Sequence, residues 1–179
     1  MLRLSFALVL ALSFSSLGAQ TSYNMVSLGN WHDPDLELSR VRYNDVWGYA
    51  ANGREYALLG SRGFVHVLDI TDPTNITEIA RLNDVTGSSS IWRDIKVHGD
   101  YAYMVTEAAE GLQVIDLTDL PNSASVIYQT TAEFSTCHNI FIDESVSPAK
   151  LYAFGTNTGA QRDGYIVYSL ADPEEPTLL

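Results

Sequence analysis

The chain has 179 residues, of which 46% are hydrophobic, and its 22 acidic against 10 basic residues give a formal net charge of −12. This composition excludes a disordered tail, a collagen-like repeat and a small disulfide-stapled domain, because Cys137 is the single cysteine. A net negative chain without a basic stripe repels phosphate groups, which argues against nucleic-acid binding.

The first 19 residues have the pattern of a secretory signal peptide. Arg3 precedes an apolar run over residues 4–12, and smaller residues follow up to Ala19. The apolar run is short for a bilayer span, and no apolar segment of spanning length follows. We therefore expect a secreted or cell-surface protein that is cleaved near Ala19, without a transmembrane helix in its mature part. Loss of Arg3 would change the net charge from −12 to −13.

Residues 20–43 are expected to form an N-terminal segment. Within it, Met25-Val26-Ser27-Leu28-Gly29 resembles a single β-strand that has no partner strands before it.

The remaining chain, 44–179, consists of three similar β-rich segments, at approximately 44–82, 93–130 and 138–179. Each begins with a polar pair, and the equivalent residues Asp45, Asp94 and Asn139 lie 49 and 45 residues apart. A period of this size, built from short β-rich runs separated by Gly, Asp and Pro, is typical of the blades of a β-propeller.

Consecutive apolar residues indicate strands that are buried on both faces. Such pairs occur in every repeat, at Leu58-Leu59, Val67-Leu68, Val114-Ile115 and Ile166-Val167. A sandwich strand with one wet face would alternate instead, whereas stacked blades bury both faces of their middle strands. The sequence thus predicts an all-β protein, a β-propeller of four-stranded antiparallel blades.

Two segments resemble LVIVD repeats, namely Phe64-Val65-His66-Val67-Leu68-Asp69-Ile70 and Gly111-Leu112-Gln113-Val114-Ile115-Asp116-Leu117. The wider run from Tyr43 to Asp143 is similar to the choice-of-anchor B family, and this resemblance covers essentially everything after the signal peptide. It implies an exported, often surface-attached β-propeller, and it implies no particular reaction.

Three repeats are fewer than a closed propeller needs, since propellers have about four to eight blades. We therefore expect this sequence to be a fragment of about three blades, the last cut short at residues 176–179. In the complete ring, Met25 to Gly29 would supply the closing strand of the final blade, and surface attachment would depend on a missing C-terminal region. The alternative, a true three-blade protein, would leave two large apolar faces open.

Polar residues at the start of the first strand of each repeat are the candidate ligand-binding residues. A propeller brings these positions together at the mouth of its central channel, near the loops at 61–63, 107–110 and 156–163. The candidates are Asp45, Arg93, Asp94, His138 and Asn139. Such a funnel could bind a cation, a sugar or a peptide.

Each candidate also has a structural interpretation. Asp readily accepts hydrogen bonds from nearby backbone N–H groups. We favour this role for Asp45 and Asp94 because the two residues occupy equivalent positions in successive repeats. His138 is the first candidate for function because imidazole titrates near neutrality, the alternative being a hydrogen-bonded structural histidine. The oxygen donors of Asp45, Asp94 and Asn139 would suit calcium rather than zinc, but no contiguous calcium loop occurs. No cofactor is therefore predicted.

Two functions remain open. The first is a non-catalytic exported binding or scaffold module that presents the channel mouth to a protein or a glycan. The alternative is an exported hydrolase or lyase that uses His138 with Asp45 or Asp94, with or without a divalent cation. We favour the binding module because the sequence has no nucleophile elbow, no metalloprotease helix and no phosphate loop. No catalytic residue is assigned.

Overall fold

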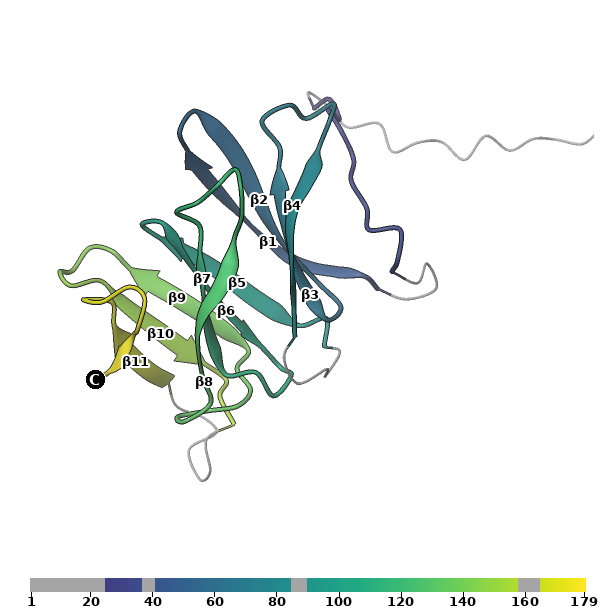
Figure 1. Cartoon of the computed structure of the whole chain (residues 1–179). Coiled ribbons are helices and arrows are strands. Elements are labelled where there is room, and N and C mark those ends of the chain that lie inside the picture. The colour runs from purple at the N-terminus through teal and green to yellow at the C-terminus, as the bar shows by residue number, and fades with distance from the viewer. Residues whose placement is uncertain (1–24, 37–40, 85–89, 158–164) are drawn as a thin grey trace, which may run out of the picture.

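The computed structural model describes residues 25–36, 41–84, 90–157 and 165–179. In this part of the chain all regular structure is β, in three four-stranded antiparallel sheets without a helix (Figure 1). The all-β, four-stranded antiparallel prediction is confirmed, and the propeller itself stays a prediction. The expected signal peptide, residues 1–19, lies outside the described residues.

Each sheet is a meander whose strands follow one another in chain order. The first sheet contains β1 (Tyr43–Ala51), β2 (Arg54–Ser61), β3 (Phe64–Asp69) and β4 (Thr77–Asn83). The second contains β5 (Arg93–His98), β6 (Tyr101–Thr106), β7 (Leu112–Asp116) and β8 (Ser125–Thr130). The third contains β9 (Asn139–Asp143), β10 (Lys150–Phe154), β11 (Tyr165–Ser169) and β12 (Thr177–Leu178).

Local sequence explains the turns that separate these strands. Asn52 and Gly53 link β1 to β2 with positive φ angles of 54° and 72°, as a type I′ hairpin requires. After the third strands, Asp69 accepts a hydrogen bond from the N–H of Thr71 at 2.9 Å, and Asp116 one from Thr118 at 2.8 Å. These Asx turns redirect the chain toward the fourth strand.

The hydrophobic core lies between the sheets, in two clusters. Leu58 and Val67 of the first sheet meet Ile95 and Ile115 of the second, and all four side chains are fully buried. A second cluster joins the opposite face of the second sheet to the third sheet. The second sheet is therefore covered on both faces, as the paired apolar residues predicted.

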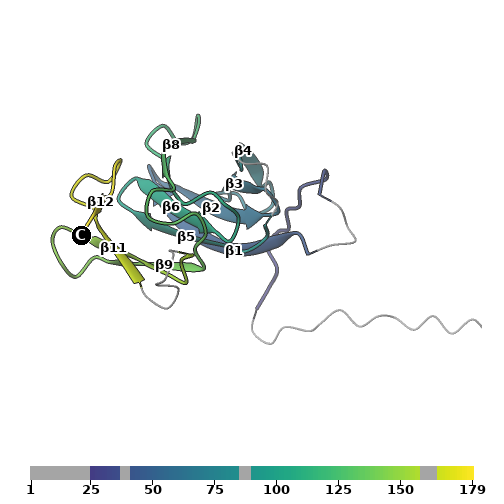
Figure 2. The same ribbon diagram turned by 90° about the horizontal axis from the view of Figure 1, so that it is seen from below.

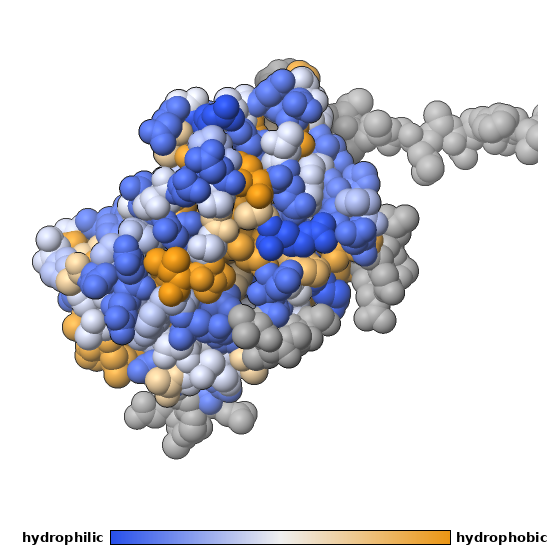
Figure 3. Space-filling view, in the orientation of Figure 1, coloured by the Kyte–Doolittle hydropathy of each residue, from blue (hydrophilic) through white to orange (hydrophobic). Residues whose placement is uncertain are grey.

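The third sheet differs, because only one of its faces is covered. Along β10, buried Leu151 and Ala153 alternate with the more exposed Tyr152 and Phe154. Ile166 and Val167 are likewise only half-buried, so the expectation of two buried faces is wrong for this sheet. Hydrophobic surface is visible where the third sheet and the C-terminus lie (Figure 3).

The first strands of the three sheets lie next to one another. Strand β5 contacts both β1 and β9. Seen from below, β1, β5 and β9 lie along one side of the molecule and β4 and β8 along the other (Figure 2). The polar residues that begin these strands are therefore brought together, as the repeat predicted.

Residues 25–36 of the N-terminal segment run along the first sheet without forming a strand. Residues 25–30 are coil, and a Cβ on Gly29 would lie 1.8 Å from the carbonyl oxygen of Pro73. The proposed ring-closing strand at Met25 needs a sheet beyond these three and stays a prediction. No helix in the described residues is long and apolar enough to span a membrane.

Candidate functional site

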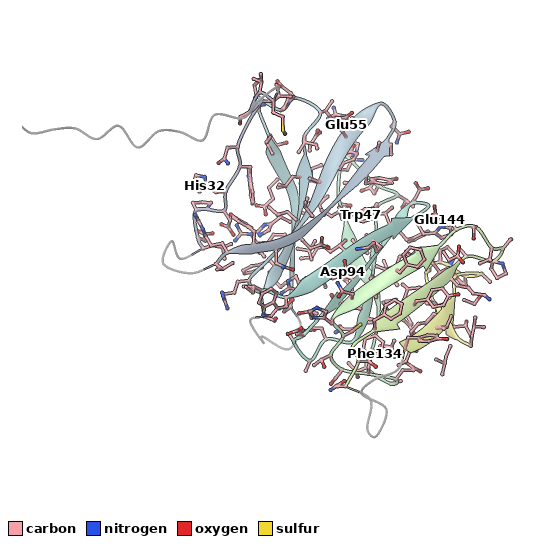
Figure 4. All side chains as sticks on the ribbon, turned by 180° about the vertical axis from the view of Figure 1, so that it is seen from behind. His32, Trp47, Glu55, Asp94, Phe134 and Glu144 are labelled. Carbon is pink, nitrogen blue, oxygen red and sulfur yellow. The ribbon has the colours of Figure 1, made fainter. Side chains whose placement is uncertain are left out.

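Asp45 and Asp94 make the same hydrogen bond at successive joints between sheets. Oδ2 of Asp45 accepts the backbone N–H of Ile95 at 2.7 Å, and Oδ2 of Asp94 accepts that of Ile140 at 2.7 Å. Each carboxylate thus links the first strand of one sheet to the first strand of the next. Figure 4 labels Asp94 among these strands. These are backbone hydrogen bonds of the kind that we favoured for the two aspartates.

A β-bulge in β1 brings Asp45 to this joint. Asp45 has a φ of 50°, and the register of β1 against β2 shifts between Tyr43 and Val46. Burial of the carboxyl group raises the pKa of Asp45, and nearby Asp94 raises it further, against the lowering effect of the Ile95 N–H and Lys96.

Asp94 is engaged through both of its oxygens. Oδ1 is paired with the ammonium group of Lys96, which also lies 4.5 Å from the ring centroid of Trp47. Oδ2 accepts the Ile140 N–H and lies 3.4 Å from the amide nitrogen of Asn139. A calcium ion held by Asp45, Asp94 and Asn139 would therefore have to displace these donors.

Arg93 is buried at the joint between the first and second sheets. Its side chain has no exposed surface, and its guanidinium bonds Asp84 at 2.6 Å and the carbonyl oxygen of Ser61 at 2.7 Å. Asn44 accepts the backbone N–H of Arg93 at 3.1 Å. This geometry gives Arg93 a structural role instead of the expected place at an open channel mouth.

His138 and Asn139 are the exposed members of the candidate set. Its side chain is 60% exposed, and Nδ1 lies 2.5 Å from Oε1 of Glu107, which belongs to the loop between β6 and β7. The backbone N–H of His138 donates to the carbonyl oxygen of Phe154 at 3.0 Å, which fixes the main chain at this residue. The structure therefore presents His138, Glu107 and the exposed Asn139 to solvent.

Metal binding has little support from this arrangement. No group of three or more His, Cys, Asp or Glu side chains among residues 25–36, 41–84, 90–157 and 165–179 could hold a metal ion.

Cys137 is 1% exposed, and burial raises the pKa of its thiol to about 12. It is therefore protonated at neutral pH.

Sequence reasoning missed a buried polar cluster on the first sheet. His66 alternates with Val65 and Val67, which face the second sheet, so its ring points to the opposite face. Its Nε2 lies 2.7 Å from Oγ of Ser61, and its Nδ1 lies 2.6 Å from Oε1 of Glu78. The only sequence signal is a polar residue between two buried valines, and the strand register is needed to identify its partners.

The segment Trp31–Leu36, here called the N-terminal strap, covers this cluster. The carboxylate of Asp33 is fully buried and bonds Arg81 of β4 at 2.8 Å. The ring of Trp31 lies 5.0 Å from that of His66, and the N–H of Asp33 donates to the hydroxyl of Tyr43 at 2.6 Å. The strap is therefore attached by both charged and aromatic contacts.

Comparison with known proteins identifies a known repeat in one part of the chain. Residues 91–127, which contain β5, β6 and β7 and the start of β8, match the family model of the LVIVD repeat. The second sheet is built on an LVIVD repeat. No curated protein and no solved structure matches the chain. The repeat suggests a β-propeller-type module, consistent with three similar sheets in succession.

Proposed function

We propose that the three sheets are consecutive blades of a β-propeller, in an exported or cell-surface protein of the choice-of-anchor B family. The LVIVD repeat supports the repeat type. The Asp45–Ile95 and Asp94–Ile140 hydrogen bonds support the arrangement, because they join successive sheets in the same way. A joint that repeats with one geometry between like units generates a ring when the rotation closes.

The faces of the sheets support the same proposal. Val67 on the first sheet and Val114 on the second are fully buried by the sheet that follows them. In the described residues no further sheet covers their equivalent on the third sheet, Val167, which is half-buried on the open face. That face also presents Phe141, Tyr152, Phe154 and Tyr165. Phe141 is 56% and Tyr165 63% exposed, as expected of a surface on which a further blade packs.

We infer that the function of this module is non-catalytic binding of a protein or a glycan at the end that carries His138. This inference is based on a difference among the candidate residues, since some are held in the joints between sheets and others are exposed. Asp45, Arg93 and Asp94 are engaged in joints between sheets, whereas His138 and Glu107 stand exposed on that frame. Exposed polar groups on a rigid scaffold are typical of a recognition surface.

Printed glycan and peptide arrays, probed with the purified chain, test this function. His138→Ala should weaken binding of an array ligand by about tenfold or more, since a histidine–carboxylate pair contributes charge-assisted hydrogen bonds. The matched control is His98→Ala, because His98 pairs with Glu144 at 2.7 Å at the other end of β5. Equal loss in both variants, or no ligand on either array, would contradict the proposal.

The alternative is a hydrolase or lyase centred on His138, and the 2.5 Å contact with Glu107 is what favours it. A carboxylate can orient an imidazole for proton transfer. Metal analysis of the purified protein separates the two functions. A stoichiometric metal that is lost in His138→Ala would support the enzyme, and absence of metal with unchanged stability would support binding.

Export is tested separately, by N-terminal sequencing of the protein secreted from a host that expresses the whole chain. Cleavage after Ala19 would leave Gln20 as the first residue. An uncleaved protein retained in the cell would contradict this part of the proposal.

A further inference from the structure

The outer face of the first sheet holds a serine, a histidine and a carboxylate in one hydrogen-bonded row. Ser61 ends β2, His66 lies in β3 and Glu78 in β4, so three adjacent strands supply the three side chains. Oγ of Ser61 is 2.7 Å from Nε2 of His66, and Oε1 of Glu78 is 2.6 Å from Nδ1. Ser61 and His66 are both fully buried.

These contacts match the roles of a serine, a base and an orienting acid. When the Nδ1–H of His66 donates to Glu78, Nε2 is left as the acceptor for the Ser61 hydroxyl. This is the tautomer in which an imidazole can take the proton of a serine nucleophile, and the arrangement is recognised by geometry and not by sequence order. The carbonyl of Ser61 is also fixed, because it accepts the 2.7 Å bond from Arg93.

In the described residues, the N-terminal strap is what covers this row. No neighbouring sheet covers His66 in the described structure, and the strap residues Trp31 and Asp33 lie over it instead. Oδ2 of Asp33 is buried and has no hydrogen-bond partner among the described residues, and it lies 4.0 Å from Nε2 of His66. A buried carboxylate oxygen without a hydrogen-bond partner costs free energy. The closed position of the strap is therefore locally destabilised next to Ser61.

We propose that Ser61 is a nucleophile toward carboxylic esters and related electrophiles, occluded by the N-terminal strap and reactive when the strap lifts. This activity is separate from ligand binding at His138 and goes beyond it. In the reaction, a bond forms between Oγ of Ser61 and the acyl carbon, and the ester C–O bond breaks. The proton of Ser61 passes through Nε2 of His66 to the leaving alcohol. Water then hydrolyses the acyl–serine by the reverse proton path.

A fluorophosphonate probe tests the nucleophile in the full chain, because its P–F bond breaks as Oγ bonds phosphorus and fluoride leaves. Mass spectrometry of the labelled protein should locate the adduct on Ser61. Ser61→Ala should abolish it, and Glu78→Gln should slow it, since the carboxylate positions the histidine.

Variants that weaken the N-terminal strap test whether the strap limits access to Ser61. Trp31→Ala should speed labelling of Ser61 by about tenfold or more, because weaker packing raises the open population. Asp33→Asn, which weakens the Arg81 contact, provides an independent variant should Trp31→Ala fail to fold. Ser145 serves as the reference, because it is exposed and bonds a carboxylate, Asp143, at 2.6 Å.

Circular dichroism would first establish that each variant is folded. Labelling of Ser61 that exceeds labelling of Ser145, and that increases when the strap is weakened, supports the proposal. A folded strap variant in which Ser61 reacts no faster than Ser145 would overturn it and leave the row a structural network.

Discussion

At the scale of single residues, the carboxylates of Asp45 and Asp94 show how one side chain can join two sheets. Each accepts a backbone N–H from the next sheet at 2.7 Å. A buried N–H that loses its acceptor costs free energy, because water cannot replace the bond. The two aspartates are therefore structural residues in a position where sequence alone also allowed a ligand site.

Asp94→Ala should lower the free energy of unfolding by about 2 kcal/mol, because it strands the Ile140 N–H and leaves Lys96 without its carboxylate. Asp94→Asn keeps an acceptor oxygen and should cost about half as much. Urea denaturation of the two variants measures the difference. Equal losses would show that the hydrogen bond to Ile140 contributes nothing beyond the charge.

The raised pKa of Asp45 has a consequence for the pH dependence of stability. The folded protein holds this proton more tightly than the unfolded chain, so the group favours folding at low pH. That contribution is lost as the pH rises from the unfolded value, about 4, through the folded pKa. The wild type should therefore lose stability relative to Asp45→Asn, which keeps an acceptor for Ile95, as the pH rises above about 4.

Asp72 provides the control of opposite sign. Hydrogen bonds from the hydroxyl and backbone N–H of Thr74 lower the pKa of Asp72, so its contribution is lost as the pH falls. Urea midpoints measured across the pH range for Asp45→Asn and Asp72→Asn should diverge from the wild type in opposite directions. Parallel curves would contradict the assignment for Asp45.

At the scale of elements, the repeats and strand runs were predictable because their pattern is local. Consecutive apolar residues and Asp-Pro turns mark strands and their ends without knowledge of partners. The Asp45 bulge and the Ser61–His66–Glu78 row were not predictable in this way, since both depend on register across strands. The alternation in β10 was missed because it reflects an uncovered face, which no pattern within the strand reports.

Gly111, which directly precedes β7, gives a test at this scale. Gly111 has a φ of 68°, and a Cβ there would lie 1.9 Å from the carbonyl oxygen of Thr130. Gly111→Ala should therefore destabilise the protein by more than about 2 kcal/mol, through backbone strain and displacement of β8. Gly99 has a similar φ of 57° but open space around it, so Gly99→Ala should cost only about 1 kcal/mol. Thermal unfolding compares the two, and similar losses would show that the contact with Thr130 is unimportant.

At the scale of the whole molecule, the three sheets share one order of strands but not one environment. The second sheet is covered on both faces, while the third presents Phe141, Tyr152 and Tyr165 on its open face. This asymmetry separates what the sequence could predict from what it could not. A repeat defines the unit, but the burial of each unit depends on its neighbours.

Substitution of the equivalent residues Val67 and Val167 measures this difference in burial between the first and third sheets. Val67→Ala should cost about 2 kcal/mol, because its side chain is fully buried between the first and second sheets. Val167→Ala should cost less than about 1 kcal/mol, because Val167 is half-buried on the open face. Urea denaturation of the two variants measures both losses of unfolding free energy. Equal costs would mean that Val167 is already covered in solution.

The Asp45–Ile95 and Asp94–Ile140 joints also bear on how such a chain can diversify. Each demands one acceptor side chain from a unit and one main-chain N–H from its successor, and every residue except proline supplies the latter. Loops, surface charge and even core composition are then free to drift while the units stay in alignment. Units whose sequences have diverged in this way can still be joined by the same hydrogen bond.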